Sequence, residues 1–354
     1  MEYGIQLATS SHHWRVVKRA EEMGFTHAWF YDTQLLNADV FVAMAAAAMQ
    51  TTKIKLCTGV LIPSNRIAPV TASALASLNA LAPGRIVMGV GTGFTGRRTM
   101  GLPAITLQRL EEYLRVVGAL LRGETVEWSE EGGPHKVRFL NPELKLINIA
   151  DPIPFHVSAF GPRGQALVAK LGTGWLCAGN PHRAGAQLAA LKKSWAEAGH
   201  QSDALYATTF GAGCVLAEGE AADSPRARAQ AGPNATMIFH DEAEHGELGS
   251  LGIPEIPQFK AQYEAYRKIY QGYQPADARY LSNHRGHLMF LRPEEQALIT
   301  PELIRGTTLT GTAPELTERV RAFKAAGFHQ FAVHLRIGHE FAMLDDWAKV
   351  IEAV

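Results

Sequence analysis

Glycines lie close together in the segment Gly89-Val90-Gly91-Thr92-Gly93, at the end of a predicted strand. A G-x-G-x-x-G pattern can hold the phosphates of a dinucleotide when it opens a βαβ unit and an acidic residue ends the following strand. Here the acid at suitable spacing, Glu111, lies within a strongly periodic helix, and the glycines follow the fourth predicted strand. We therefore interpret Gly91, Thr92 and Gly93 as a surface that lets a planar ligand approach the backbone closely.

Side chains that can transfer protons also occur near predicted strand ends. Imidazole is best suited to acid–base chemistry near neutral pH, and a carboxylate can hold or accept a proton. His284 and His287 have a spacing found in metal sites, but no carboxylate or third histidine lies suitably near them in the sequence, so no metal is predicted. The acid–base candidates are Asp32, His12, His13, His284, His287 and His334.

The order of predicted elements indicates an α/β fold, a (β/α)₈ barrel. Short apolar runs alternate with helical patterns, and eight such runs suit a closed barrel better than a doubly wound sheet of five or six strands. The runs are residues 3–8, 26–31, 53–62, 85–90, 155–159, 175–178, 206–216 and 331–335. We expect one domain over residues 1–354.

Two insertions interrupt this rhythm, at about 123–152 after strand four and 218–305 after strand seven. The second is too long for a passive loop and is expected to be a lid or binding segment. The active site of such a barrel lies at the carboxyl ends of its strands. Strand ends and the second insertion supply our candidates for a substrate pocket: His12, Trp14, Phe94, His284 and Asn180.

Composition limits the possible partners. Lysine plus arginine equals aspartate plus glutamate, at 34 each, so no net charge attracts nucleic acid. No secretory signal and no apolar stretch of membrane-spanning length is visible, so we expect a cytoplasmic protein without a membrane partner. The three unevenly spaced cysteines are expected to be buried, reduced thiols.

Several segments resemble the bacterial luciferase-like superfamily of flavin-dependent monooxygenases and deazaflavin-dependent, methylenetetrahydromethanopterin reductase-like oxidoreductases. They occur in the expected order over nearly the whole chain, which makes the match specific for the family but not for a substrate. They include residues 20–25 with Trp29-x-x-Asp32, 55–63, 69–72, 81–85, 88–93, 159–163 and 309–315.

The resemblance implies roles for two backbone segments. The Gly59-Val60 bond corresponds to a non-prolyl cis peptide on which the isoalloxazine ring rests, the alternative being an ordinary β-bulge. The loop at 158–164 corresponds to the flavin phosphate site, the alternative being a loop whose arginine is merely solvated. Residues assigned to this site are Ser158, Ala159, Phe160, Gly161, Arg163 and Gly164.

The chain departs from the family pattern at two positions. Relatives often have histidine after the acid at Asp32, whereas this chain has Thr33, whose hydroxyl can hydrogen-bond a flavin edge but cannot shuttle protons near neutral pH. Phe94 stands where similar deazaflavin-dependent sugar-phosphate dehydrogenases have a catalytic glutamate. The block His284-Arg285-Gly286-His287 resembles one branch of the superfamily, and it implies that His287 faces the flavin. Catalytic roles are thus expected for Asp32, Thr33 and His287.

The first functional hypothesis is a reduced-FMN-dependent monooxygenase that oxygenates a small organic substrate through a flavin peroxide. The alternative is hydride transfer with the deazaflavin coenzyme F420, which the segment Asn37-Ala38-Asp39-Val40 favours by resemblance. A metal-dependent barrel hydrolase is a more distant third, because the chain lacks an early His-x-His. Similarity to the superfamily also implies a homodimer or homotetramer and, for the FMN hypothesis, a separate flavin reductase.

Overall fold

Eight parallel strands form a closed barrel in the order β1-β12-β9-β8-β7-β4-β3-β2. The structure is a computed structural model that describes residues 1–130, 132–179, 181–246 and 256–354. The predicted (β/α)₈ barrel is confirmed. Its strands are β1 (Glu2–Leu7), β2 (His27–Phe30), β3 (Lys55–Leu61), β4 (Ile86–Val90), β7 (Phe155–Ser158), β8 (Gly174–Ala178), β9 (Ala207–Gly211) and β12 (Gln330–His334).

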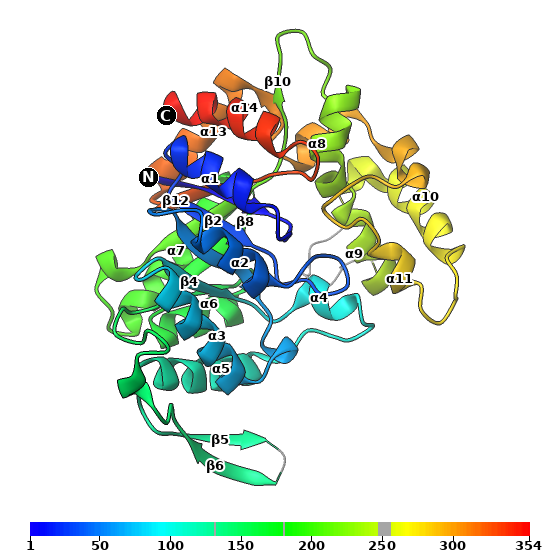
Figure 1. Cartoon of the computed structure of the whole chain (residues 1–354). Coiled ribbons are helices and arrows are strands. Elements are labelled where there is room, and N and C mark those ends of the chain that lie inside the picture. The colour runs from blue at the N-terminus through cyan, green and yellow to red at the C-terminus, as the bar shows by residue number, and fades with distance from the viewer. Residues whose placement is uncertain (131, 180, 247–255) are drawn as a thin grey trace.

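A helix follows every barrel strand along the chain and packs on its outside (Figure 1). Asp39 illustrates how the sequence starts such a helix, because its carboxylate accepts hydrogen bonds from the backbone N–H groups of Phe41 and Val42. These helices are α1 (Trp14–Glu22), α2 (Val40–Ala48), α3 (Ala68–Leu81), α5 (Leu107–Leu121), α6 (Pro162–Leu171), α7 (Pro181–Glu197), α13 (Ala313–Ala326) and α14 (Glu340–Glu352).

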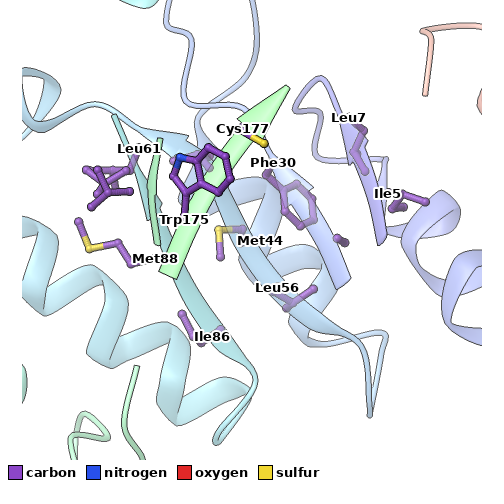
Figure 2. Packing of buried hydrophobic residues seen from close by; sticks show 14 of the residues in the cluster. Ile5, Leu7, Phe30, Met44, Leu56, Leu61, Ile86, Met88, Trp175 and Cys177 are labelled. Carbon is purple, nitrogen blue, oxygen red and sulfur yellow. The ribbon is translucent and has the colours of Figure 1, made fainter. Parts of the chain in front are cut away.

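Alternation along the strands divides the barrel residues into two hydrophobic layers. Phe30 and Leu56 belong to the cluster between strands and helices, and Figure 2 shows them there with Met44 of α2. Trp29 and Cys57, the neighbours in sequence, belong to a separate cluster. Successive side chains of a strand point to opposite faces, so this second cluster fills the inside of the barrel.

The seventh predicted strand, residues 206–216, is wrong at its carboxyl end. The barrel strand β9 ends at Gly211, and β10 (Val215–Leu216) pairs instead with β11 (Gly311–Thr312) outside the barrel. Gly213 explains the break, since a Cβ atom there would lie 2.0 Å from the carbonyl oxygen of Leu309. The chain leaves the barrel where another backbone approaches it too closely for a side chain.

Both predicted insertions contain their own elements. The first includes the antiparallel hairpin of β5 (Val126–Glu130) and β6 (Gly133–Val137), which projects from the barrel (Figure 1). The described part of the second is mainly helical and lies beside α4 (Phe94–Arg98). Its helices are α8 (Pro225–Ala235), α9 (Met237–His245), α10 (Lys260–Gln271), α11 (Tyr280–Asn283) and α12 (Pro301–Thr307).

The described cysteines Cys57, Cys177 and Cys214 are buried and form no disulfide, as predicted. Over the described ranges, no helix combines the length and the apolar character needed to cross a membrane.

Candidate active site

The floor of the strand-end site is built from closely packed backbone. The Gly59–Val60 peptide is cis, in agreement with the resemblance, and the pairing of β3 with β4 shifts register between Thr58 and Leu61. A Cβ atom on Gly89 would lie 2.2 Å from the Thr58 carbonyl oxygen, and one on Gly91 would lie 3.0 Å from Val60 Cγ2. The sequence therefore needs glycine here because neighbouring chain occupies the side-chain space.

Residues next to this floor turn the chain toward α4. Gly93 has a φ angle of +83° and precedes the first residue of the helix, while the Thr92 carbonyl accepts a hydrogen bond from the Ile105 N–H. Gln6 Nε2 donates to the Gly59 carbonyl at 3.2 Å from inside the barrel. The structure thus brings together the predicted ring-contact residues Gly59, Val60, Gly91, Thr92 and Gly93.

Asp32 is buried beneath the loop that follows β3. Its carboxylate accepts hydrogen bonds from the Ile62 N–H and from Arg66, whose Nη1 lies 2.9 Å from Oδ1. Both carboxylate oxygens are engaged, so Asp32 holds the segment after the cis peptide in place. The half-buried Thr33 follows it. Catalytic roles for these two residues stay predictions.

The predicted phosphate loop joins β7 to α6. Ala159 is buried, and its carbonyl accepts a hydrogen bond from Trp175 Nε1, whereas Phe160, Gly161 and Arg163 are exposed. Gly161 is the N-cap of α6 and supplies no side chain to satisfy the first N–H groups of the helix. Such a helix start can bind a phosphate, and the Arg163 guanidinium adds positive charge. The half-buried Ser158 and Gly164 flank this exposed turn.

His287 lies at the contact between the second insertion and α4. It is buried, its Nε2 is 3.2 Å from the Thr95 hydroxyl, and its Nδ1 has no partner among the described residues. Burial and the neighbouring histidines hold the pKa of His287 well below its usual range. A neutral imidazole with a free ring nitrogen can hydrogen-bond a ligand or take up a proton from it.

His284 packs beside this histidine, and Phe94 lies on the adjoining helix α4. His284 Nε2 lies 3.1 Å from a Glu244 carboxylate oxygen, and the His284 and His287 ring centres are 5.6 Å apart. The Arg98 guanidinium covers the Phe94 ring at 3.5 Å and also pairs with Asp241 of α9 at 2.9 Å. His284 and His287 therefore form one buried pair, and the half-buried Phe94 lies next in sequence to Thr95, which contacts His287.

Two other pocket candidates do not join this group. His12 is exposed, and Trp14 packs partly against the cluster between barrel and helices. The Ala8 carbonyl binds His13 Nδ1 at 2.5 Å, and His13 Nε2 in turn lies 3.3 Å from Glu340, so this loop turns toward α14. Asn180, also predicted for the pocket, lies outside the described residues.

Sequence reasoning gave too little weight to a group across the barrel mouth. The Tyr31 hydroxyl and His334 Nε2 are 2.5 Å apart, at the ends of β2 and β12, and Arg336 is buried two residues further on. Arg336 had no signal in the sequence, because an arginine just after a strand usually reaches solvent. In the part of the chain that the structure describes, no three histidine, cysteine or acidic side chains are placed to hold a metal ion.

The chain is similar to several known proteins. A family model described as luciferase-like monooxygenase matches residues 4–330. A 5,10-methylenetetrahydromethanopterin reductase of Archaeoglobus fulgidus is 31% identical over 183 residues, which are 50% of this chain and 52% of that protein. An F420-dependent glucose-6-phosphate dehydrogenase of Beutenbergia cavernae is 34% identical over 141 residues, 38% of this chain and 40% of that protein.

Among solved structures, the coenzyme F420-dependent tetrahydromethanopterin reductase from Methanopyrus kandleri superposes with a TM-score of 0.69 at 20% identity, covering 100% of this chain and 99% of that chain. At this identity the superposition supports the fold alone. The chain matches about half the length of the first of these curated relatives and less of the second.

Proposed function

Because the chain belongs to the luciferase-like monooxygenase family, we propose that it is an oxidoreductase that transfers hydride between coenzyme F420 and a small organic substrate. The observation that carries this choice is the similarity to an F420-dependent dehydrogenase over 141 residues. This similarity favours hydride transfer with F420, the alternative in the sequence analysis, over the FMN monooxygenase hypothesis. Assembly into two or four copies is part of the same proposal.

The residues at the strand ends fit a planar redox coenzyme. A Cβ atom on Gly91 would press against the Val60 side chain, so glycine lets the backbone pack closely beside the cis peptide of Gly59 and Val60. These backbone groups would hold the ring, and the exposed start of α6 with Arg163 would hold a phosphate. When bound, the coenzyme supplies or accepts the hydride.

The chain's own side chains would orient the substrate and manage the proton. His287 is neutral, and its Nδ1 has no partner in the described part of the chain, so it can accept a proton from a hydroxyl or hold one near a carbonyl oxygen. The second insertion covers this side of the mouth through its contacts with α4, such as Arg98 with Asp241. Such a cover excludes water from the reacting groups.

A second candidate is a reduced-FMN-dependent monooxygenase, which the description of the matching family model favours. It would need the same floor but also a supply of reduced FMN from a separate reductase. The two candidates differ in whether the bound coenzyme reacts with oxygen, so they can be separated experimentally.

Anaerobic titration of the protein with F420 and with FMN, followed by absorbance and fluorescence, tests the proposal. We expect micromolar binding of F420 and weaker binding of FMN. Gly91→Ala places a methyl group on the floor and should raise the F420 Kd about tenfold, equivalent to roughly 1.4 kcal/mol. The matched control is Gly306→Ala, because an added Cβ there has no neighbour closer than 3.5 Å.

Two results would overturn the proposal. One is the absence of F420 binding at micromolar concentration. The other is tight FMN binding with oxygen uptake by the reduced complex that depends on an added substrate, which would instead establish the second candidate.

A further inference from the structure

Three arginines are buried in the part of the chain that the structure describes, and two of them face a carboxylate. Arg98 pairs with Asp241, and Arg292 pairs with Glu295. The third, Arg336, is 1% exposed, and the groups that its side chain hydrogen-bonds among the described residues are neutral. A buried guanidinium without an opposite charge is costly, so its retention needs an explanation.

Contacts with α8 satisfy only some of the hydrogen-bond donors of the Arg336 side chain. Arg336 Nε donates to the Gln230 carbonyl at 3.1 Å, and Nη2 donates to Asn234 Oδ1 at 2.6 Å. These bonds tie the second insertion to the barrel, but they do not neutralise the charge. Within the described ranges, Arg336 Nη1 has no hydrogen-bond partner, and neither has the side-chain nitrogen of Gln230, which is also 1% exposed. Two buried donors are thus left free on neighbouring residues.

The position of Arg336 links these donors to the mouth of the barrel. Arg336 lies two residues after His334, the last residue of β12, whose Nε2 contacts the Tyr31 hydroxyl. Along β12, Ala332 belongs to the cluster inside the barrel, so His334 points inward by the same alternation. Gln6 pairs in register with His334 and donates to the Gly59 carbonyl. Arg336, His334 and Tyr31 therefore adjoin the proposed coenzyme floor.

We propose that Arg336, with Gln230 beside it, forms an anion subsite at the barrel mouth that binds the carboxylate of a small organic substrate. A carboxylate supplies the missing negative charge and accepts hydrogen bonds from donors that are otherwise unsatisfied. That the bound carboxylate belongs to the substrate rests on the proposed function, whereas the binding of an anion does not. A coenzyme that carries acidic groups is the other source of the same chemistry.

Binding of benzoate and of benzamide, an uncharged analogue of similar shape, tests the subsite by calorimetry. We expect the wild-type protein to bind benzoate at least about tenfold more tightly than benzamide, because hydrogen bonds to a charged group are the stronger ones. Arg336→Met should abolish this preference. Asn234→Ala is the matched control, since it removes one bond of the Arg336 tether but keeps the charge.

Repeating the titration on protein saturated with F420 distinguishes the two sources. Unchanged benzoate binding supports a substrate subsite, and competition by F420 overturns it in favour of a coenzyme subsite. Equal binding of benzoate and benzamide by the wild-type protein refutes the anion subsite without any variant, as does an unchanged preference in folded Arg336→Met. Failure of F420 to bind at all would refute the proposed function but leave the benzoate comparison valid.

Discussion

Glu295 offers a quantitative test of how the second insertion is held together. Its side chain is 1% exposed, and it contacts His240 Nε2 at 2.5 Å and Arg292 through both the guanidinium and the backbone N–H. The Tyr266 hydroxyl also contacts Arg292. Glu295→Gln removes the negative charge from this network with little change of shape.

The expected contribution of Glu295 to the free energy of unfolding follows from the pKa of its carboxyl group. Burial alone would raise the pKa, but the hydrogen bonds from His240 and Arg292 and the positive charge of Arg292 outweigh burial and lower it from 4.5 to about 2. Because the pKa is depressed in the folded state, the ionised form stabilises the protein fully above about pH 4.5, and this stabilisation is lost as the pH falls toward 2. The shift corresponds to about 3 kcal/mol, at about 1.4 kcal/mol per unit.

Urea denaturation of the wild type and of Glu295→Gln at several pH values between 7 and 3.5 measures this contribution. The difference in unfolding free energy should stay constant above pH 5 and should decrease by about 1.4 kcal/mol per pH unit below 4.5. Other carboxyl groups titrate in both proteins and cancel in the difference. Glu318→Gln, at an exposed pair with Arg321, is the control and should show no such slope. A difference for Glu295→Gln that stays constant down to pH 3.5 would refute the reasoning.

Three further predictions concern the floor, the proton-transfer group and the thiols. Gly89→Ala should lower the unfolding free energy by about 3 kcal/mol or prevent folding, because its Cβ would overlap the Thr58 carbonyl. Thermal melting measures this, and a melting temperature as little changed as that of Gly306→Ala would contradict it. His287→Ala should slow single-turnover hydride transfer at least about a hundredfold with an unchanged F420 Kd, so an unchanged rate would exclude an acid–base role. A thiol reagent should label no cysteine in the native protein and all of them in denaturant, because burial raises their pKa; labelling before unfolding would contradict the burial of Cys57, Cys177 and Cys214.

Sequence patterns predicted the barrel well because the signal of each strand is local. Apolar runs and helix-capping residues such as Asp39 need only a few neighbours to be recognised. The exception was the seventh strand, where Gly213 meets the Leu309 carbonyl. That contact joins positions far apart in the chain, so no local pattern in residues 206–216 could reveal where the strand ends.

The candidate site was predictable in its backbone and less so in its side chains. The cis peptide at Gly59 was predicted from the family resemblance of the segment 55–63, and the structure has it. The Tyr31–His334 contact joins residues 303 positions apart, and Arg98–Asp241 joins residues 143 apart. Strand-end position also suggested Trp14 for the pocket, but the loop there turns toward α14. Whether a charged side chain finds a partner depends on such distant contacts.

This division between backbone and side chains bears on the choice of coenzyme. Gly89 and Gly91 are dictated by contacts with neighbouring barrel strands, so the floor would be the same under any planar ring of similar size. A floor of this kind does not distinguish FMN from a deazaflavin. Discrimination must then come from the walls, where Thr33 replaces the expected imidazole and the second insertion brings His287 against α4. Substitutions in these walls, more than in the floor, should change which coenzyme the protein prefers.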